Sequence, residues 1–281
     1  MANDKAVSDH YQHGELLQAI QTALGKLGKS IDNLSIEDLA AVDEFHIGGR
    51  IATENLLDQF DVSAEHHLLD VGCGLGGAAR FVADRFDSQV SGIDLTPEYI
   101  DTGKALSEWV NLQDNVSLHQ GSALTMPFQD ESFDGGYMLH VGMNIEDKAQ
   151  LFTEIYRVLR AGAYFGIYDV MRIEPGELTY PVPWANDSSI SKLASPGQYR
   201  QALLGTGFEV SAENNRGEFA LDYFTRLREK MAASGGPPAL GLHTLMQAST
   251  PLKIGNMFDN ISAGYIAPVE MIAHKKSAPL P

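Results

Sequence analysis

A glycine-rich segment and an aspartate downstream of it carry the clearest chemical signal in this sequence. Residues 68–77 read LLDVGCGLGG, so the glycines directly follow a short apolar run. Glycines at a turn from a strand into a helix let the backbone approach a ligand and point amide N–H groups at it. Asp94 lies 18 residues after Gly76, where a carboxylate can accept both ribose hydroxyls of a nucleoside. We therefore expect a nucleotide site, although Gly72-x-Gly74-x-x-Gly77 alone also matches a dinucleotide fingerprint.

The segments around these residues alternate between strand and helix patterns. Short apolar runs typical of buried strands alternate with stretches of helical periodicity, which indicates βαβ units and a parallel sheet with helices on both faces. Thr96 and Pro97 open one of the helices, as its cap and its first residue. The predicted strands are 67–71, 89–94, 116–120, 133–139 and 164–170, and the predicted helices among them include 78–86 and 147–159.

Both ends of the chain fall outside this alternation. Residues 1–60 have helical spacing, with a capping-box start at Ser35, and we expect them to form a cap or lid. We expect the α/β core at 61–214 with a lid-like insertion at 171–194, a helical insertion at 215–260, and the last strand and tail at 261–281. Within these parts the patterns favour helices at 51–60, 196–204, 218–233 and 240–257, strands at 208–212 and 265–273, and a frayed tail from 275 to 281.

Four segments in this order resemble the motifs of class I S-adenosylmethionine-dependent methyltransferases. Asp70-x-Gly72-x-Gly74-x-Gly76 resembles the first motif, and residues 92–96 (GIDLT) resemble the second. Residues 121–128 with 132–134 resemble the motifs at the third and fourth strands, and residues 157–162 (RVLRAG) resemble the turn before the fifth. The resemblance covers residues 68–170. It implies an α/β, Rossmann-like, doubly wound and mostly parallel seven-stranded sheet with an antiparallel last strand, a helical N-terminal cap and a C-terminal helical insertion.

The same resemblance implies S-adenosylmethionine as the cofactor and S-adenosylhomocysteine as the product. Carried over residue by residue, it places these residues at the cofactor: Asp70, Gly72, Gly74, Gly76, Asp94, Leu95, Ser122, Ala123 and His140. The family often has an acid where Ser122 stands, which accepts the adenine amino group. A serine can still form a hydrogen bond there, but it adds no charge. Ala161 and Ala163 also depart from the family pattern around Gly162.

Several side chains are expected near the position of methyl transfer. His140 and Met143 follow the fourth predicted strand, at the edge of the sheet where such folds bind ligands. We expect His140 to be a general base or a substrate contact, the alternative being a loop histidine that holds the backbone. Packing explains Met143 equally well. The predicted lids add Tyr11, His46, Arg50, Tyr180 and Trp184 as substrate or sulfonium contacts, or else as apolar anchors and, for Arg50, a surface ion pair.

A closer resemblance narrows the expected reaction. Residues 45–50 (FHIGGR), 140–145 (HVGMNI) and 181–184 (PVPW) resemble the sarcosine/dimethylglycine N-methyltransferase group, and the branch is similar to ubiquinone-biosynthesis methyltransferases. This favours N-methylation of a glycine, sarcosine or dimethylglycine-type amine by in-line displacement. The alternatives are a C- or O-methyltransferase of a quinone or other natural product, an NAD-dependent oxidoreductase, and a non-catalytic nucleotide-binding protein. Apolar pocket walls would favour a quinone, and an arginine with aromatic residues would favour an amino acid.

Composition limits the partners of the chain. Its 281 residues include 20 Lys and Arg against 37 Asp and Glu, a net charge of −17. Such an acidic surface repels phosphate backbones and anionic headgroups, so we expect a small-molecule methyl acceptor and neither nucleic acid nor membrane. One cysteine (Cys73), no leader pattern and no apolar run of about 20 residues favour a cytoplasmic protein. The histidines form no ligand set, so we expect no metal site; a homodimer stays open.

Overall fold

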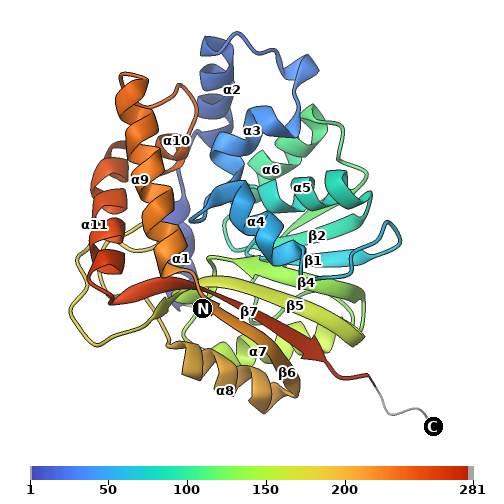
Figure 1. Ribbon diagram of the computed structural model, residues 1–281. Coiled ribbons are helices and arrows are strands. Elements are labelled where there is room, and N and C mark those ends of the chain that lie inside the picture. The colour runs from blue at the N-terminus through green and yellow to red at the C-terminus, as the bar shows by residue number, and fades with distance from the viewer. Residues whose placement is uncertain (1, 278–281) are drawn as a thin grey trace.

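Seven strands form one mixed sheet in the computed structural model, which describes residues 2–277 (Figure 1). The strand order is β3-β2-β1-β4-β5-β7-β6. The first strand therefore lies inside the sheet, and the later strands lie on both sides of it. Strands β1 to β5 are parallel, and β7 runs antiparallel to both of its neighbours, which confirms the predicted fold class. The strands are β1 (His67–Val71), β2 (Gln89–Asp94), β3 (Val116–Gln120), β4 (Phe133–Leu139), β5 (Leu159–Arg172), β6 (Phe208–Asn215) and β7 (Ile266–Lys275).

Helices cover both faces of the sheet (Figure 1). One face is packed against α4 (Gly49–Leu57), α5 (Gly77–Phe86) and α6 (Pro97–Trp109). The other face is packed against α7 (Lys148–Val158) and α8 (Pro196–Thr206). Each face buries a continuous apolar layer, which gives the sheet the two cores of a doubly wound fold.

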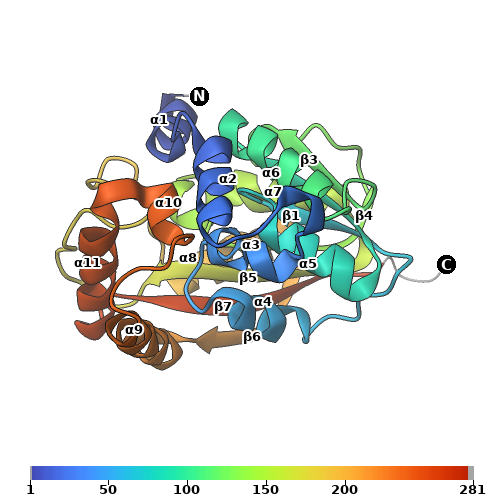
Figure 2. The same cartoon turned by 90° about the horizontal axis from the view of Figure 1, so that it is seen from above.

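The remaining helices gather beyond one edge of the sheet, around the carboxyl ends of the parallel strands (Figures 1 and 2). Three of them precede the sheet in the chain, and three connect β6 to β7. They are α1 (Ala2–Tyr11), α2 (Leu16–Lys26), α3 (Ile36–Asp43), α9 (Gly217–Ala233), α10 (Leu242–Met246) and α11 (Thr250–Ser262). Within residues 2–277 no helix combines the length and the apolar character that crossing a membrane requires.

Two elements predicted in the C-terminal third of the chain differ from the structure. The single helix expected at 240–257 is wrong, because the chain breaks at Gln247 (φ +53°) and Pro251 begins a new helix in its first turn, where proline is tolerated. The frayed tail is wrong at its first residue. Lys275 ends β7, and its buried ammonium donates to the carbonyls of Tyr156 (2.9 Å) and Leu159 (2.6 Å). Residues 278–281 lie outside the described part of the chain.

Candidate functional site

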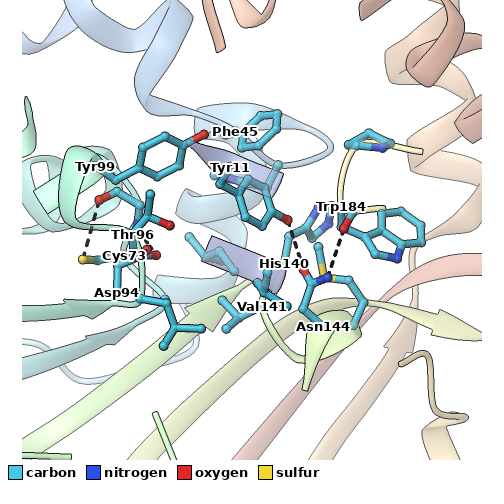
Figure 3. A pocket seen from close by; sticks show the side chains of 18 of the residues that line it. Tyr11, Phe45, Cys73, Asp94, Thr96, Tyr99, His140, Val141, Asn144 and Trp184 are labelled. Carbon is cyan, nitrogen blue, oxygen red and sulfur yellow. Dashed lines mark hydrogen bonds between the residues drawn. The ribbon is translucent and has the colours of Figure 1, made fainter. Parts of the chain in front are cut away.

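The turns after β1, β2, β3 and β4 line one cavity of about 340 Å³, which α1 and the helices between β6 and β7 help to enclose. It lies at the edge of the sheet where open α/β folds bind ligands. The polar end of the cavity is lined by Asp4, Asp43, Asp70, Gly72, Gly74, Asp94, Leu95, Ser122 and Ala123. The apolar end is lined by Met143, Trp184, Phe224, Leu227, Ile254 and Met257, which belong to one apolar cluster. Figure 3 shows Asp94 on one side of the cavity, His140 and Trp184 on the other, and Tyr11 between them.

The glycine turn after β1 has a backbone that other residues adopt only with strain. Gly72 (φ +67°) and Gly74 (φ +54°) both line the cavity in the left-handed region. A Cβ on Gly72 would lie 2.5 Å from Val141, so a side chain cannot be added there without a shift. Gly74 has no side chain between its backbone and the cavity, which leaves that stretch of wall open to a ligand.

Asp94 connects the first two turns and ends at the cavity wall. Its carboxylate accepts from the backbone N–H of Gly74 (3.0 Å) and from that of Thr96 (2.8 Å). Burial raises the pKa of Asp94 more than these two hydrogen bonds lower it. Deeper in the same end, burial raises the pKa of Asp70 to about 8. Both carboxyl groups lie at the cavity, as expected from the sequence. Asp94 can accept hydrogen bonds from the hydroxyl groups of a ligand.

His140 lies at the cavity wall with a neutral ring. Its ring stacks on that of Tyr168 at 5.2 Å, and the His46 ring meets it edge-on at 6.0 Å. Burial lowers the pKa of His140 well below its usual range, and the neighbouring His46 lowers it further. Within the described residues, the buried Nε2 of His140 has no hydrogen-bond partner. An uncharged imidazole with an unused nitrogen can accept a proton or a hydrogen bond from a ligand.

His46 completes this wall and is also uncharged. Its Nε2 lies 3.0 Å from the carbonyl oxygen of Gly49 and 2.9 Å from the hydroxyl of Thr53. Burial lowers the pKa of His46 to about 4. The two imidazoles therefore present no positive charge to the cavity at neutral pH.

Asn144 joins three segments of the cavity wall (Figure 3). Its Oδ1 accepts from the hydroxyl of Tyr11 at 3.0 Å, and its Nδ2 donates to the carbonyls of Trp184 and Ile190, each at 3.0 Å. The N-terminal helix, the loop after β4 and the connection after β5 thus meet at one amide. Next to it, Met143 is buried in the apolar cluster and also lines the cavity, so it both packs and faces the ligand space.

Three of the predicted site residues do not line the cavity. The Nε of Arg50 donates to the Glu44 carboxylate, and its guanidinium lies 4.1 Å from the centre of the Phe81 ring. This placement favours the alternative of an ion pair for Arg50, although the partner Glu44 is buried and the pair does not lie on the surface as expected. Tyr180 packs against the apolar cluster from outside. Gly76 (φ +75°) caps α5 and donates to the carbonyl of Cys73, so its role is in the turn and not at the wall.

Several wall residues were missed by the sequence analysis. Asp4, Asp43 and Tyr99 line the polar end, and the side chains from α9 to α11 form most of the apolar end. No local pattern marks these residues, because they reach the cavity only through long-range packing. The described wall has no lysine or arginine, and its acidic residues are Asp4, Asp43, Asp70, Asp94, Glu146 and Asp147.

Residues 69–167 match the family model described as "Methyltransferase domain". The methyltransferase GfsG of Streptomyces halstedii is 33% identical over 171 residues, which cover 60% of this chain and 59% of that protein. The chain spans about three fifths or less of the length of the first curated relatives that it matches.

Solved structures resemble the chain over almost its whole length. A geranyl diphosphate C-methyltransferase from Streptomyces coelicolor A3(2) has a TM-score of 0.71 at 17% identity, with 98% of each chain covered. A candidate sarcosine dimethylglycine methyltransferase from Galdieria sulphuraria has a TM-score of 0.67 at 18% identity, with 98% of this chain and 99% of that chain covered. At such identities the likeness concerns the fold. Residues 69–167 of this chain therefore match a methyltransferase domain, and the sheet around them has the fold of these solved methyltransferases.

Proposed function

We propose that this protein transfers a methyl group from S-adenosylmethionine to a small, largely apolar acceptor without a negative charge. The observation that carries the proposal is the cavity at the carboxyl ends of the parallel strands, whose polar end suits a nucleoside and whose apolar end suits a hydrophobic molecule. The matched methyltransferase domain supports the reaction type.

The polar end fits the cofactor in shape and in charge. S-adenosylmethionine supplies an activated methyl group on a cationic sulfonium and carries no phosphate. Asp4 and Asp94 line this end and no lysine or arginine of the described chain does, which favours a ligand with positive charges. Gly74 leaves backbone open to the amino-acid part, and Asp94 at the end of β2 is placed to accept the ribose hydroxyls. Leu95 and Ala123 offer apolar surface to the adenine ring.

His140 is the candidate for handling a proton of the acceptor. Its ring lines the cavity and is uncharged, and its buried Nε2 has no hydrogen-bond partner within the described residues, so we expect it to accept a proton from a hydroxyl or an amine. Its low pKa keeps the imidazole unprotonated at neutral pH, so it is available to accept a proton. An uncharged imidazole also adds no repulsion against a cationic sulfonium.

The apolar end favours the alternative acceptor over the glycine-type amine. Sulfur, indole and aliphatic side chains form its walls, and Trp184 and Met143 are almost fully buried there. Burying such walls against a hydrophobic ligand is favourable, at about 25 cal/mol per Å² of apolar surface. The acidic side chains repel the carboxylate of glycine, sarcosine or dimethylglycine. The solved C-methyltransferase is named for geranyl diphosphate, whose geranyl part is apolar, and this supports a hydrophobic acceptor for the present chain.

Two measurements test the proposal. Calorimetric titration with S-adenosylmethionine, S-adenosylhomocysteine and NAD should show micromolar binding of the two adenosyl ligands only. Asp94→Ala should weaken that binding at least tenfold, whereas Asp101→Ala, at an exposed position of α6, should leave it unchanged. Binding of NAD alone would contradict the cofactor.

The acceptor is then identified with methyl-labelled cofactor. Neutral prenyl alcohols, sterols and quinones should take up label faster than glycine, sarcosine and dimethylglycine. Faster labelling of the three amino acids would instead establish the glycine-type N-methyltransferase and overturn the acceptor proposed from the apolar end.

A further inference from the structure

The N-terminal helix α1 places the carboxylate of Asp4 next to Ser122, at the polar end of the cavity. The hydroxyl of Ser122 donates to Oδ2 of Asp4 at 3.1 Å, although 118 residues separate the two. Both residues line the cavity, next to Leu95 and Ala123. Asp4 lies in the first turn of α1, so its carboxylate also complements the positive end of that helix dipole.

Separate contacts hold α1 in this position. At its far end the Tyr11 hydroxyl donates to Asn144, as described above. Directly after α1, the Glu98 carboxylate of α6 accepts from the backbone N–H groups of His13 (2.6 Å), Gly14 (2.8 Å) and Leu16 (2.9 Å). These hydrogen bonds outweigh the effect of burial and lower the pKa of Glu98. The C-terminal end of α1 is therefore held by contacts that do not involve the side chain of Asp4.

The chemistry of this corner is that of a hydrogen-bond acceptor for an amino group. Ser122 already receives a hydrogen bond from the N–H of Leu124 (3.3 Å) and gives its own proton to Asp4. A carboxylate is a much stronger acceptor than a neutral hydroxyl, and it carries several acceptor positions. An amino group is attracted to it, whereas a carbonyl oxygen at the same place is repelled.

We propose that Asp4 and Ser122 together recognise the exocyclic amino group of adenine, with Asp4 supplying the negative charge. This inference rests on the proposed cofactor, whose ribose Asp94 would hold and whose base would then extend past Leu95 toward Ser122. In this proposal, a residue of α1 recognises the adenine ring of the cofactor. The helix then contributes to the choice of adenine as well as to the covering of the cavity.

Paired ligands separate this role from a merely structural one. Calorimetry compares S-adenosylhomocysteine with S-inosylhomocysteine, in which an oxo group replaces the amino group. The wild type should prefer the adenosyl ligand by tenfold or more. In Asp4→Ala the adenosyl ligand should bind about tenfold more weakly and the inosyl ligand should bind no worse, so that the preference largely disappears. Asp4→Asn, of equal size, should lose most of the same preference.

Two control variants fix the interpretation. Asp9→Ala removes another acid of α1, one that is exposed and paired with Lys5, and it should change neither affinity. Tyr11→Phe should weaken both ligands by the same factor, because it acts on the position of α1 and not on the base. An equal loss of both ligands in Asp4→Ala would overturn the role of Asp4 while leaving the proposed cofactor intact. Failure of the wild type to bind S-adenosylhomocysteine at all would overturn both.

Discussion

The hydroxyl of Tyr11 donates to Oδ1 of Asn144 at 3.0 Å, and so links the first helix to the loop after β4. Figure 3 shows the Tyr11 ring between the two ends of the cavity. A hydrogen bond of this kind contributes about 1 kcal/mol net. Tyr11→Phe should therefore weaken cofactor binding about fivefold and increase hydrogen exchange across residues 2–11. Unchanged affinity, measured by calorimetry with S-adenosylhomocysteine, would show that this link does not hold the helix closed.

The glycine turn predicts opposite effects for two glycine-to-alanine changes. Gly72→Ala places a Cβ 2.5 Å from Val141 at a backbone with φ +67°, so it should cost about 1–3 kcal/mol of unfolding free energy and disturb the cofactor turn. Gly255→Ala lies inside α11 with open space around it, so it should add up to about 1 kcal/mol. Urea unfolding of both variants measures the contrast. A neutral Gly72→Ala would show that the turn can relax.

A buried ion pair supports the same turn from behind. Arg80 is fully buried, donates to Asp43 at 2.5 Å, and also donates to the carbonyl of Leu75 (2.8 Å) within the glycine turn. Asp43→Ala leaves the buried charge of Arg80 without its partner, so it should lower the free energy of unfolding by about 3–5 kcal/mol.

The double change tests whether the two residues act as a pair. The double variant Asp43→Leu with Arg80→Met should lose much less unfolding free energy than the single variants Asp43→Leu and Arg80→Met lose together. Additive losses in urea unfolding would show that the two side chains act independently.

The buried imidazole of His46 makes the fold sensitive to acid. Its pKa is about 4 in the folded protein and about 6.5 when unfolded, so below pH 6.5 the unfolded chain binds the extra proton. The stability contributed by the neutral ring is complete above pH 6.5 and is lost as pH falls toward 4, by about 1.4 kcal/mol per pH unit. Urea unfolding at pH 7, 6 and 5 should show this slope, and His46→Gln should reduce it. An equal slope in the variant would assign the acid sensitivity to other groups.

The proposed role of His140 predicts a separation between binding and turnover. His140→Phe keeps an aromatic ring against Tyr168 but removes the ring nitrogens, including the unpartnered Nε2. For an acceptor that loses a proton, turnover should fall about a hundredfold while affinity for S-adenosylhomocysteine changes less than threefold. In the wild type, His140 itself should add no pH dependence to turnover near neutral pH, because burial holds the pKa of this imidazole well below its usual range. Full turnover in His140→Phe would exclude the proton-accepting role.

The sheet and the cofactor turn could be predicted because their signals are local. Strands β1 to β4 begin and end at the predicted residues, since short apolar runs bounded by glycine or polar residues define them. The positions of Gly72, Gly74 and Asp94 follow from the geometry of a strand-to-helix turn. β5 is longer than the predicted 164–170: it begins at Leu159, which pairs with Phe133 of β4, and its pairing with β7 continues to Arg172.

The acceptor half of the site could not be derived in the same way. Asp4 reaches Ser122, and α9 and α11 reach the apolar end, only through contacts between distant parts of the chain. Arg50 looked like an anion contact because its charge is visible in the sequence, whereas its partner Glu44 is visible only in the fold. The sequence therefore located the donor half of the proposed reaction better than the acceptor half.

The antiparallel β7 gives the protein a means of changing its substrate without rebuilding its nucleotide site. The chain leaves the sheet after β6 and returns through β7, and these strands pair with each other, Asn215 opposite Val269. The whole segment from α9 to α11 thus starts and finishes at one place on the sheet, away from the glycine turn. Such a segment can change in sequence, or be replaced, without moving the strands that it connects. The choice of acceptor can then evolve while the turns that bind the methyl donor stay the same.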